Sequence, residues 1–406
     1  MLQRKHVALM VWAAATSMLV VGKFYVAIPV IGGLADFFTI SSTRAALVGS
    51  AFGFAYAPGM IVWGTASDKW GRVNVLVAGL TAAALFTALS AVTTNFTWLL
   101  ATRALQGFAA SSFSPTTVSL LAEKLPPQSR ALGMSVIGFA FLLSAPVVQY
   151  VAVASGAPLF TVLAVSAPLL LLSAATVRLI VGPSTKASTT SAGGESRLAC
   201  LVRDRLILAA WAAATTVLFG FAAFQAALQI VPAAAGSEAL APEHIRLLGM
   251  PALLVAFLAP RVTLRHGPVT TTMVGFVVAA GAFIVAQMPF PGALIAASVV
   301  VHAGTAMAVP SLMGVVASQA DTANRGLALG IYTCILFLGA SAAPLAMHML
   351  APSRTAMFSL PASTLAAAAL LLAAARRSAA RRAAAHRNPY GGSPDESMPS
   401  RRTPTS

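Results

Sequence analysis

Long apolar runs occupy almost the whole chain, each about the 20 residues that an α-helix needs to cross the roughly 30 Å hydrocarbon core of a bilayer. Hydrophobic residues make up 58% of the 406 residues and charged residues 9%, with a mean hydropathy of +0.83. One soluble core cannot bury so much apolar surface, so lipid must solvate most of it. The strands of a barrel would alternate polar and apolar residues, which these runs do not do. The sequence therefore predicts an all-α integral membrane protein.

Twelve such runs can be placed end to end. They cover residues 7–31, 45–66, 73–92, 97–122, 131–154 and 159–179 in the first half of the chain, and 207–231, 245–260, 269–287, 293–318, 326–350 and 355–375 in the second. The eighth span is the least regular, because Glu243, His244 and Arg246 crowd its outer end. We expect twelve transmembrane helices.

Basic residues sort by side of the membrane. With the N-terminus inside, only Arg44, Arg246 and Arg354 fall outside, and the other lysines and arginines near the span ends lie in the cytoplasm. Both termini are then cytoplasmic. This sidedness explains the net charge of +16 by topology and lipid headgroups rather than by nucleic acid.

A linker rich in Gly, Ser and Thr, from Gly182 to Ser196, divides the chain into two halves. The halves repeat each other: Pro115 precedes Arg130 by the same interval at which Pro310 precedes Arg325, and residues 69–72 have a counterpart in residues 265–268. The expected units are a six-helix half (1–181), a cytoplasmic linker (182–206), a second six-helix half (207–375) and a basic disordered cytoplasmic tail (376–406). Two parallel, pseudo-symmetric copies of a six-helix unit are typical of one large class of transporters.

Two short motifs lie in the expected helices. The loop after the second span carries Gly64, Asp68, Lys69, Gly71 and Arg72, and the fourth span carries Leu99, Arg103, Gln106 and Gly107. Together they resemble the signatures of the major facilitator superfamily, closest in appearance to bacterial sugar-efflux and drug-efflux members. The fifth span departs from the glycine-rich pattern of exporters, with Ala145-Pro146 followed by Val147.

The resemblance implies a cytoplasmic gate formed by Gly64, Asp68, Lys69, Gly71, Arg72, Glu123 and Arg130. In this gate the Asp68 carboxylate contacts the N-terminus of the eleventh helix near Gly326, where the helix dipole stabilises a negative charge. Within the same gate, Arg72 forms an ion pair with Glu123. These contacts would close the inner side and break in the other state. The alternative is an ordinary turn with surface ion pairs, each worth under about 1 kcal/mol.

Polar residues at membrane depth are costly and usually face a cavity. Here they are Lys23, Arg103, Gln225, Gln229 and His302. Three of them, Lys23, Arg103 and His302, fall about 9 to 14 Å below the outer end of their spans at 1.5 Å per residue, so we expect them to converge on one ligand. Their alternatives are snorkelling for Lys23, a structural or proton-handling role for Arg103, and interhelical hydrogen bonds for the other three.

Acidic residues all fall outside the spans or at their ends. A cavity with positive groups and no carboxylate favours a neutral or anionic substrate over a cationic drug. If protons drive transport, the candidate carriers are His302 and Asp36. A uniporter is the alternative.

No catalytic constellation, nucleotide-binding loop or metal-spaced Cys/His cluster is present, and Cys200 and Cys334 imply no disulfide framework. We therefore expect no enzyme activity, no cofactor and no metal. The prediction is a monomeric secondary transporter of the bacterial inner membrane that exports a small solute by alternating access. The competing hypothesis is a transporter-derived sensor or scaffold whose basic tail binds anionic lipid or a partner.

Overall fold

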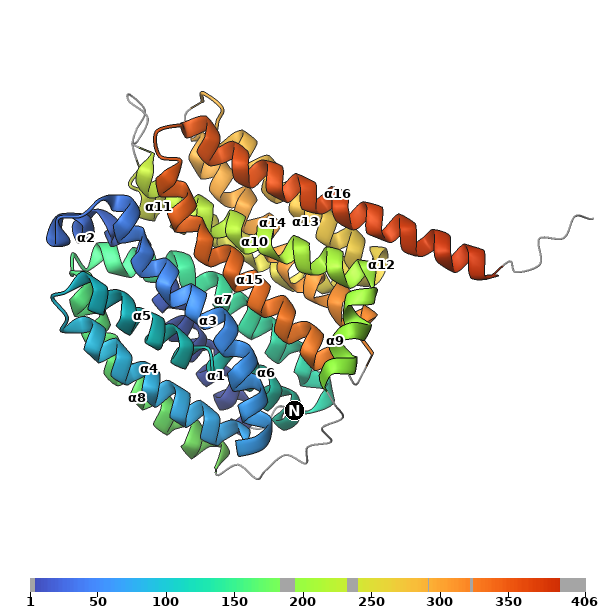
Figure 1. The fold of residues 1–406 in the computed structure, drawn as a ribbon, viewed down its shortest axis with the longest axis horizontal. Coiled ribbons are helices and arrows are strands. Elements are labelled where there is room, and N and C mark those ends of the chain that lie inside the picture. The colour runs from blue at the N-terminus through green and yellow to red at the C-terminus, as the bar shows by residue number, and fades with distance from the viewer. Residues whose placement is uncertain (1–3, 183–193, 232–239, 291, 322–323, 388–406) are drawn as a thin grey trace, which may run out of the picture.

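The computed structural model describes residues 4–182, 194–231, 240–290, 292–321 and 324–387, and in these residues it is helical without strands (Figure 1). The first half contains α1 (Arg4–Tyr25), the 3-10 turn η1 (Ile28–Val30), α2 (Ile31–Phe38), α3 (Ser42–Trp70), α4 (Arg72–Ala91), α5 (Phe96–Ala110), α6 (Phe113–Lys124), α7 (Pro127–Ala154) and α8 (Leu159–Val181). The second half contains α10 (Arg205–Ile230), α11 (Pro242–Gly249), the 3-10 segment η2 (Met250–Phe257), α12 (Ala259–His266), α13 (Pro268–Val285), α14 (Ala293–Gln319), α15 (Arg325–Met349) and α16 (Arg354–Arg387). Between them lies α9 (Gly194–Arg203).

The predicted spans correspond to these helices. Among the residues that the structure describes, ten helices are each long and apolar enough to cross a membrane, and an eleventh span is added if the one bent pair counts as a single span. The fourth predicted span is divided between α5 and α6, of 15 and 12 residues, which reach membrane length only together. With this division counted as one span, the bundle has the twelve-helix, two-half architecture that the sequence predicts.

The eighth span is broken rather than continuous. It consists of α11, η2 and α12, and its first two parts are bent by 44° from the third. Pro242, Pro251 and Pro260 fall within the first two positions of these three segments. Proline has no backbone N–H to donate and cannot continue a regular helix, so each segment starts anew.

The C-terminal region differs from the prediction. Disorder was expected from residue 376, but α16 continues to Arg387 and projects beyond the bundle (Figure 1). Alanine and arginine, which dominate this stretch, have high helix propensities. The predicted linker likewise ends in a helix, α9. Residues 183–193 and 388–406 of the predicted linker and tail lie outside the described residues.

The two ends of the bundle are named here by their acids. The Asp68 end holds the α3–α4 turn, and the Asp36 end holds α2 and α11. Contacts between the halves gather toward the Asp36 end. There Ser50 Oγ of α3 donates to the Ser341 carbonyl of α15 at 2.7 Å, and Tyr25 of α1 lies edge-on to Phe221 of α10. The halves are therefore packed together at this end of the molecule.

Candidate functional site

Arg103 joins three helices of the first half. Its guanidinium is fully buried, and from α5 its Nε donates to the Val48 carbonyl of α3 at 3.2 Å and its Nη2 to the Lys23 carbonyl of α1 at 2.6 Å. Nη1 donates to Oε1 of Gln106, one turn further along α5. The guanidinium also lies 4.8 Å from the centroid of the Phe52 ring. We call Arg103, Val48, Lys23 and Gln106 the Arg103 clamp.

Lys23 is the other buried cation of this half. Only 4% of the residue is exposed, and its ammonium makes no hydrogen bond or ion pair with any described residue. Gln106 continues the clamp to α4, because its Nε2 donates to Oγ1 of Thr87. Lys23 therefore contributes its backbone to the clamp and leaves its charge without an acidic partner.

A second polar cluster lies between α10, α11 and α14. Arg246 of α11 is fully buried, and its Nε donates to Oε1 of Gln225 at 3.1 Å and its Nη2 to the Gln225 carbonyl at 2.8 Å. Gln229, with its amide oxygen facing the guanidinium, accepts from Nη1 and Nη2 at 2.8 and 2.9 Å. Gln225 Nε2 lies 3.4 Å from Nε2 of His302, whose Nδ1 lies 2.7 Å from the Ser298 carbonyl.

Arg246 is the residue that the sequence reasoning missed. The sequence places it at the outer end of the eighth span, together with Glu243 and His244. The structure instead turns it inward, on the same face of α11 as the buried Ile245 and Gly249. A signal was available: Gln225 and Gln229 are four residues apart on α10, so they share one helical face and can hold one donor between them.

The five predicted cavity residues thus fall into two groups, one in each half. Lys23 and Arg103 belong to the first, and Gln225, Gln229 and His302 to the second. Aromatic rings connect them, because the Tyr25 ring lies 6.2 Å from that of Phe221, which lies 5.2 Å from the imidazole of His302. No hydrogen bond joins the two groups within the described part of the chain.

The charges of these buried residues all have one sign. Lys23, Arg103 and Arg246 are buried, whereas no described aspartate or glutamate is. Where an acid would compensate Arg246, the structure places the neutral amides of two glutamines. The described interior is therefore electropositive without carboxylate counter-ions.

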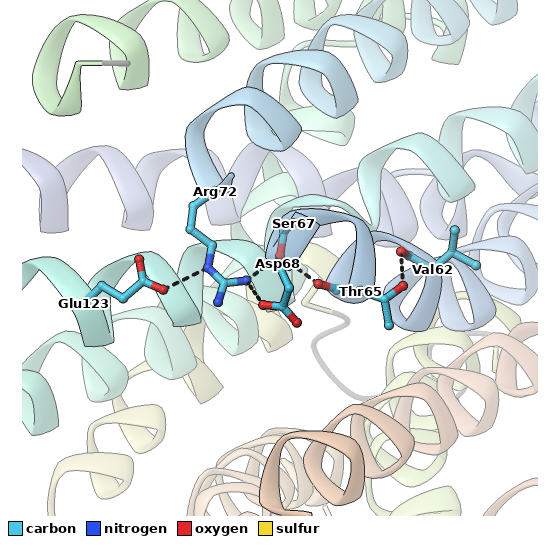
Figure 2. Close-up of polar contacts among 7 residues, drawn as sticks. Val62, Thr65, Ser67, Asp68, Arg72 and Glu123 are labelled. Atoms are coloured by element: carbon cyan, nitrogen blue, oxygen red, sulfur yellow. Dashed lines mark hydrogen bonds and ion pairs between the residues drawn. The ribbon is translucent and has the colours of Figure 1, made fainter. Parts of the chain in front are cut away.

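Arg72 lies between two acids at the Asp68 end, as Figure 2 shows. Its Nε lies 2.9 Å from Oε1 of Glu123 in α6, and its Nη1 contacts Oδ1 of Asp68 and donates to Oγ of Ser67 at 2.7 Å. The pair of Arg72 with Glu123 implied by the family resemblance is thus present. Both carboxylates are about half exposed, with side-chain exposures of 51% for Asp68 and 45% for Glu123.

The expected contact of Asp68 with α15 is not observed. Among the described residues, the Asp68 carboxylate meets Arg72, and no hydrogen bond joins it to the backbone at the start of α15. The physical reason is that the halves pack together toward the Asp36 end, while Arg72, in the first half, already supplies a positive partner.

The remaining gate candidates have different surroundings. Arg130 donates from Nε to the Leu125 carbonyl at 3.2 Å, Lys69 is exposed, and Gly64 faces Pro115 of α6. Gly71 turns the chain directly from α3 into α4 with φ 88° and ψ 145°, a backbone conformation that favours glycine. Its repeat counterpart Gly267 has φ 83° and ψ 158°, so both halves contain the same turn.

Among the residues that the structure describes, no three His, Cys, Asp or Glu side chains are grouped so as to hold a metal ion.

Comparisons with known proteins agree with this architecture. A family model described as Major Facilitator Superfamily matches residues 13–244. The 3-(3-hydroxy-phenyl)propionate transporter of Escherichia coli (strain K12) is 26% identical over 106 residues, which is 26% of each chain. Major facilitator superfamily domain-containing protein 10 of Mus musculus is 35% identical over 98 residues, 24% of this chain and 21% of that protein. These matches span about a quarter of the relatives' length.

Two solved structures share the fold. The human organic anion transporter MFSD10 (TETRAN) has a TM-score of 0.69 at 20% identity, covering 91% of this chain and 100% of that one. A bacterial homologue of the human lysosomal transporter Spinster, inward-facing and unoccupied, has a TM-score of 0.64 at 14% identity, covering 92% and 96%. The family model alone matches more than half of the chain. With its twelve-span, two-half bundle and the Gly71 turn repeated at Gly267, the chain belongs to the Major Facilitator Superfamily.

Proposed function

We propose that this membrane transporter carries small organic anions. The observation that supports the proposal is the buried set of cations, Lys23, Arg103 and Arg246, without a buried carboxylate among the described residues. An uncompensated charge in apolar surroundings is costly, and ionisable groups at membrane depth usually mark a transport pathway. An anionic solute would compensate these charges, whereas a cationic one would add to the repulsion.

The names of two similar proteins also refer to the transport of organic anions. One is a transporter of a propionate and the other, similar in fold alone, is called an organic anion transporter. Within the same proposal, a neutral polar solute that binds the glutamines is the second candidate. It would use hydrogen bonds from Gln225 and Gln229 without using the charge of Arg246.

Alternating access is the proposed mechanism. The halves, taken as residues 1–181 and 207–375, would rock about the region between the two polar clusters. The packing toward the Asp36 end and the self-contained Asp68–Arg72–Glu123 pairs support an arrangement in which the Asp68 end is the open one. In the opposite state, Asp68 would reach the start of α15 and close the gate.

The finer assignments are part of the proposal. We propose protons as the coupling ion, with export as the direction if proton and solute cross in opposite senses and uptake if they cross together. We further propose a monomer as the working unit, and a bacterial inner membrane with both termini in the cytoplasm as the location. The basic residues clustered toward the Asp68 end support the orientation. Direct flux measurements in both directions would test the first two points.

Three probes that share a benzene ring but are anionic, neutral or cationic test the substrate class. Labelled benzenesulfonate, neutral benzenesulfonamide and cationic benzyltrimethylammonium would be followed in proteoliposomes, with and without a pH gradient, against empty liposomes. We expect protein-dependent flux of the sulfonate above that of the amide and none of the cation. Flux of the cation alone would refute the proposal. Absence of flux for all three would instead favour the sensor hypothesis.

A further inference from the structure

A chain of hydrogen bonds runs from Arg246 through Gln225 and His302 to Ser298, and in each bond the donor can be identified. A guanidinium can only donate, so the amide oxygen of Gln225 must face Nε of Arg246, at 3.1 Å. The amide nitrogen of Gln225 then faces Nε2 of His302, at 3.4 Å, and donates to it. Nε2 is therefore the acceptor of a neutral ring, and Nδ1 carries the proton that it donates to the Ser298 carbonyl at 2.7 Å. We call Arg246, Gln225, His302 and Ser298 the Arg246 relay.

A second proton on His302 is incompatible with this arrangement. Protonated Nε2 would face the amide nitrogen of Gln225, so two donors would oppose each other. Turning the amide by half a rotation would satisfy the ring, but would present the amide nitrogen to Nε of Arg246. A proton on His302 therefore removes the acceptor that holds the Nε of Arg246, while the Gln225 carbonyl and Gln229 stay in place.

Few ionisable groups surround His302. The helices packed on α14 are α13, α10, α11, α12, α15 and α7, together with η2. The segments α13 and η2 carry no ionisable side chain, and α10 carries only Arg205, at its opposite end. The other packed segments carry Glu243, His244 and Arg246 in α11, Arg261, Arg265 and His266 in α12, Arg325, Tyr332, Cys334 and His348 in α15, and Arg130 and Tyr150 in α7. Of these, Arg246 is the charged group that is linked to the ring, through the side-chain amide of Gln225.

We infer that Arg246 is an anion-binding residue of the transport site and that protonation of His302 releases it to the anion. A carboxylate or sulfonate oxygen then takes the place of the Gln225 amide oxygen on Nε of Arg246. The inference rests on the proposed function, because it names the group that would recognise the organic anion. Proton and anion bind together, and by linkage each strengthens the binding of the other. This is the coupling of a symporter, so an inward proton gradient would drive uptake of the anion.

The local fold allows Arg246 to change partners. It is fully buried here, so the anion reaches it only when α11 moves. That helix is eight residues long, and the span of which it forms the first part is bent by 44° before α12. At Gly249 it packs directly on Ser298 and His302, so a movement of α11 and a rearrangement at His302 are mechanically connected.

Benzenesulfonate binding to the purified full-length transporter at pH 8 and pH 5 tests the inference, because the charge of this probe does not change over that range. We expect tighter binding at pH 5, by about the five- to 150-fold typical of coupled sites. His302→Gln should remove the pH dependence. Gln225→Met, which keeps the histidine but breaks the relay, should reduce it strongly. Thermal unfolding of each variant shows whether it is folded.

His348→Gln is the matched control, because His348 in α15 makes the same Nδ1 contact with a carbonyl four residues back, that of Pro344, at 2.8 Å, outside the relay. It should keep the wild-type pH dependence. Equal binding at both pH values in the wild type would overturn the inference, as would full pH dependence in folded His302→Gln or Gln225→Met. No binding by the folded wild type at either pH would overturn the proposed function, and this inference with it.

Discussion

Two buried arginines, Arg103 in α5 and Arg246 in α11, are hydrogen-bonded by different kinds of acceptor. Both are fully buried, and neither forms an ion pair with a described acid. Arg103 donates to backbone carbonyls of two other helices, at Val48 and Lys23. Arg246 donates mainly to the side-chain amides of Gln225 and Gln229. Backbone carbonyls within helices cannot turn away, whereas side-chain amides can.

This difference indicates different roles for the two residues. The Arg103 clamp fixes α1, α3 and α5 to one another, and its acceptors move only if a helix moves. The Arg246 relay contains a histidine, His302, and under the inference above a single proton on it turns the Gln225 amide away from Arg246. Burial and charge alone therefore do not distinguish a structural arginine from a ligand-binding one. The identity of the acceptors does.

The largest effect is expected for Arg103→Met. It removes donors from two backbone carbonyls and from Gln106, and each buried polar group left unsatisfied costs about 1–3 kcal/mol. We expect a loss of at least roughly 3 kcal/mol of stability on that basis, seen as a clear fall in Tm in detergent. Arg246→Met should cost less stability and should abolish sulfonate binding. Equal destabilisation by both would remove the distinction.

The exposed Arg44 provides the control for these two changes. Arg44→Met should leave both Tm and sulfonate binding close to wild type, since surface substitutions usually change stability by less than about 0.5 kcal/mol.

The next largest effects are expected for two glycine substitutions, one beside the Arg103 clamp and one beside the Arg246 relay. An added Cβ at Gly107 would lie 2.0 Å from the backbone oxygen of Phe52, whereas at Gly249 it would meet the side chains of Ser298 and His302, at 2.3 and 2.7 Å. Overpacking typically costs about 1–3 kcal/mol, and the rigid backbone contact should give the upper end. Gly107→Ala should therefore lower Tm more, and Gly249→Ala should alter the pH dependence of binding more. The reverse ranking would contradict the rigid-clamp and movable-relay interpretation.

Among the substitutions of buried or paired residues, the smallest effect on stability is expected for Asp68→Asn, which removes one of the two carboxylate partners of Arg72. Asp68→Asn removes a half-exposed ion pair, so Tm should change by the equivalent of under about 1 kcal/mol. Under the gate proposal, transport in proteoliposomes should nevertheless fall, with Arg44→Met, at an exposed arginine, as the control. Unchanged flux would leave the Asp68 group as an ordinary surface turn.

The sequence was informative where a single physical constraint dominates. Apolar runs of membrane length predicted the spans. The charged and polar residues at the outer end of the eighth span marked it as irregular, and the structure shows it broken into α11, η2 and α12. The motif positions Arg72 and Glu123 predicted an ion pair that is present. Arg246 was misplaced because hydropathy averages over a window, and so does not show which way one side chain points. Residues 376–387, expected in the disordered tail, are helical, which agrees with the high helix propensity of alanine and arginine.

By itself, the sequence determined the solvent, the number of spans and the repeat, because about 20 apolar residues in a row must cross the bilayer as a helix. It also supplied the glycine at the turns after α3 and α12, where Gly71 and Gly267 have a positive φ. Only the tertiary structure decided which buried charges share a site. It separated Lys23 and Arg103 from His302 and brought Arg246 to Gln225. Hydrogen bonds between helices depend on the rotation and depth of each helix, which are set by packing across the whole bundle.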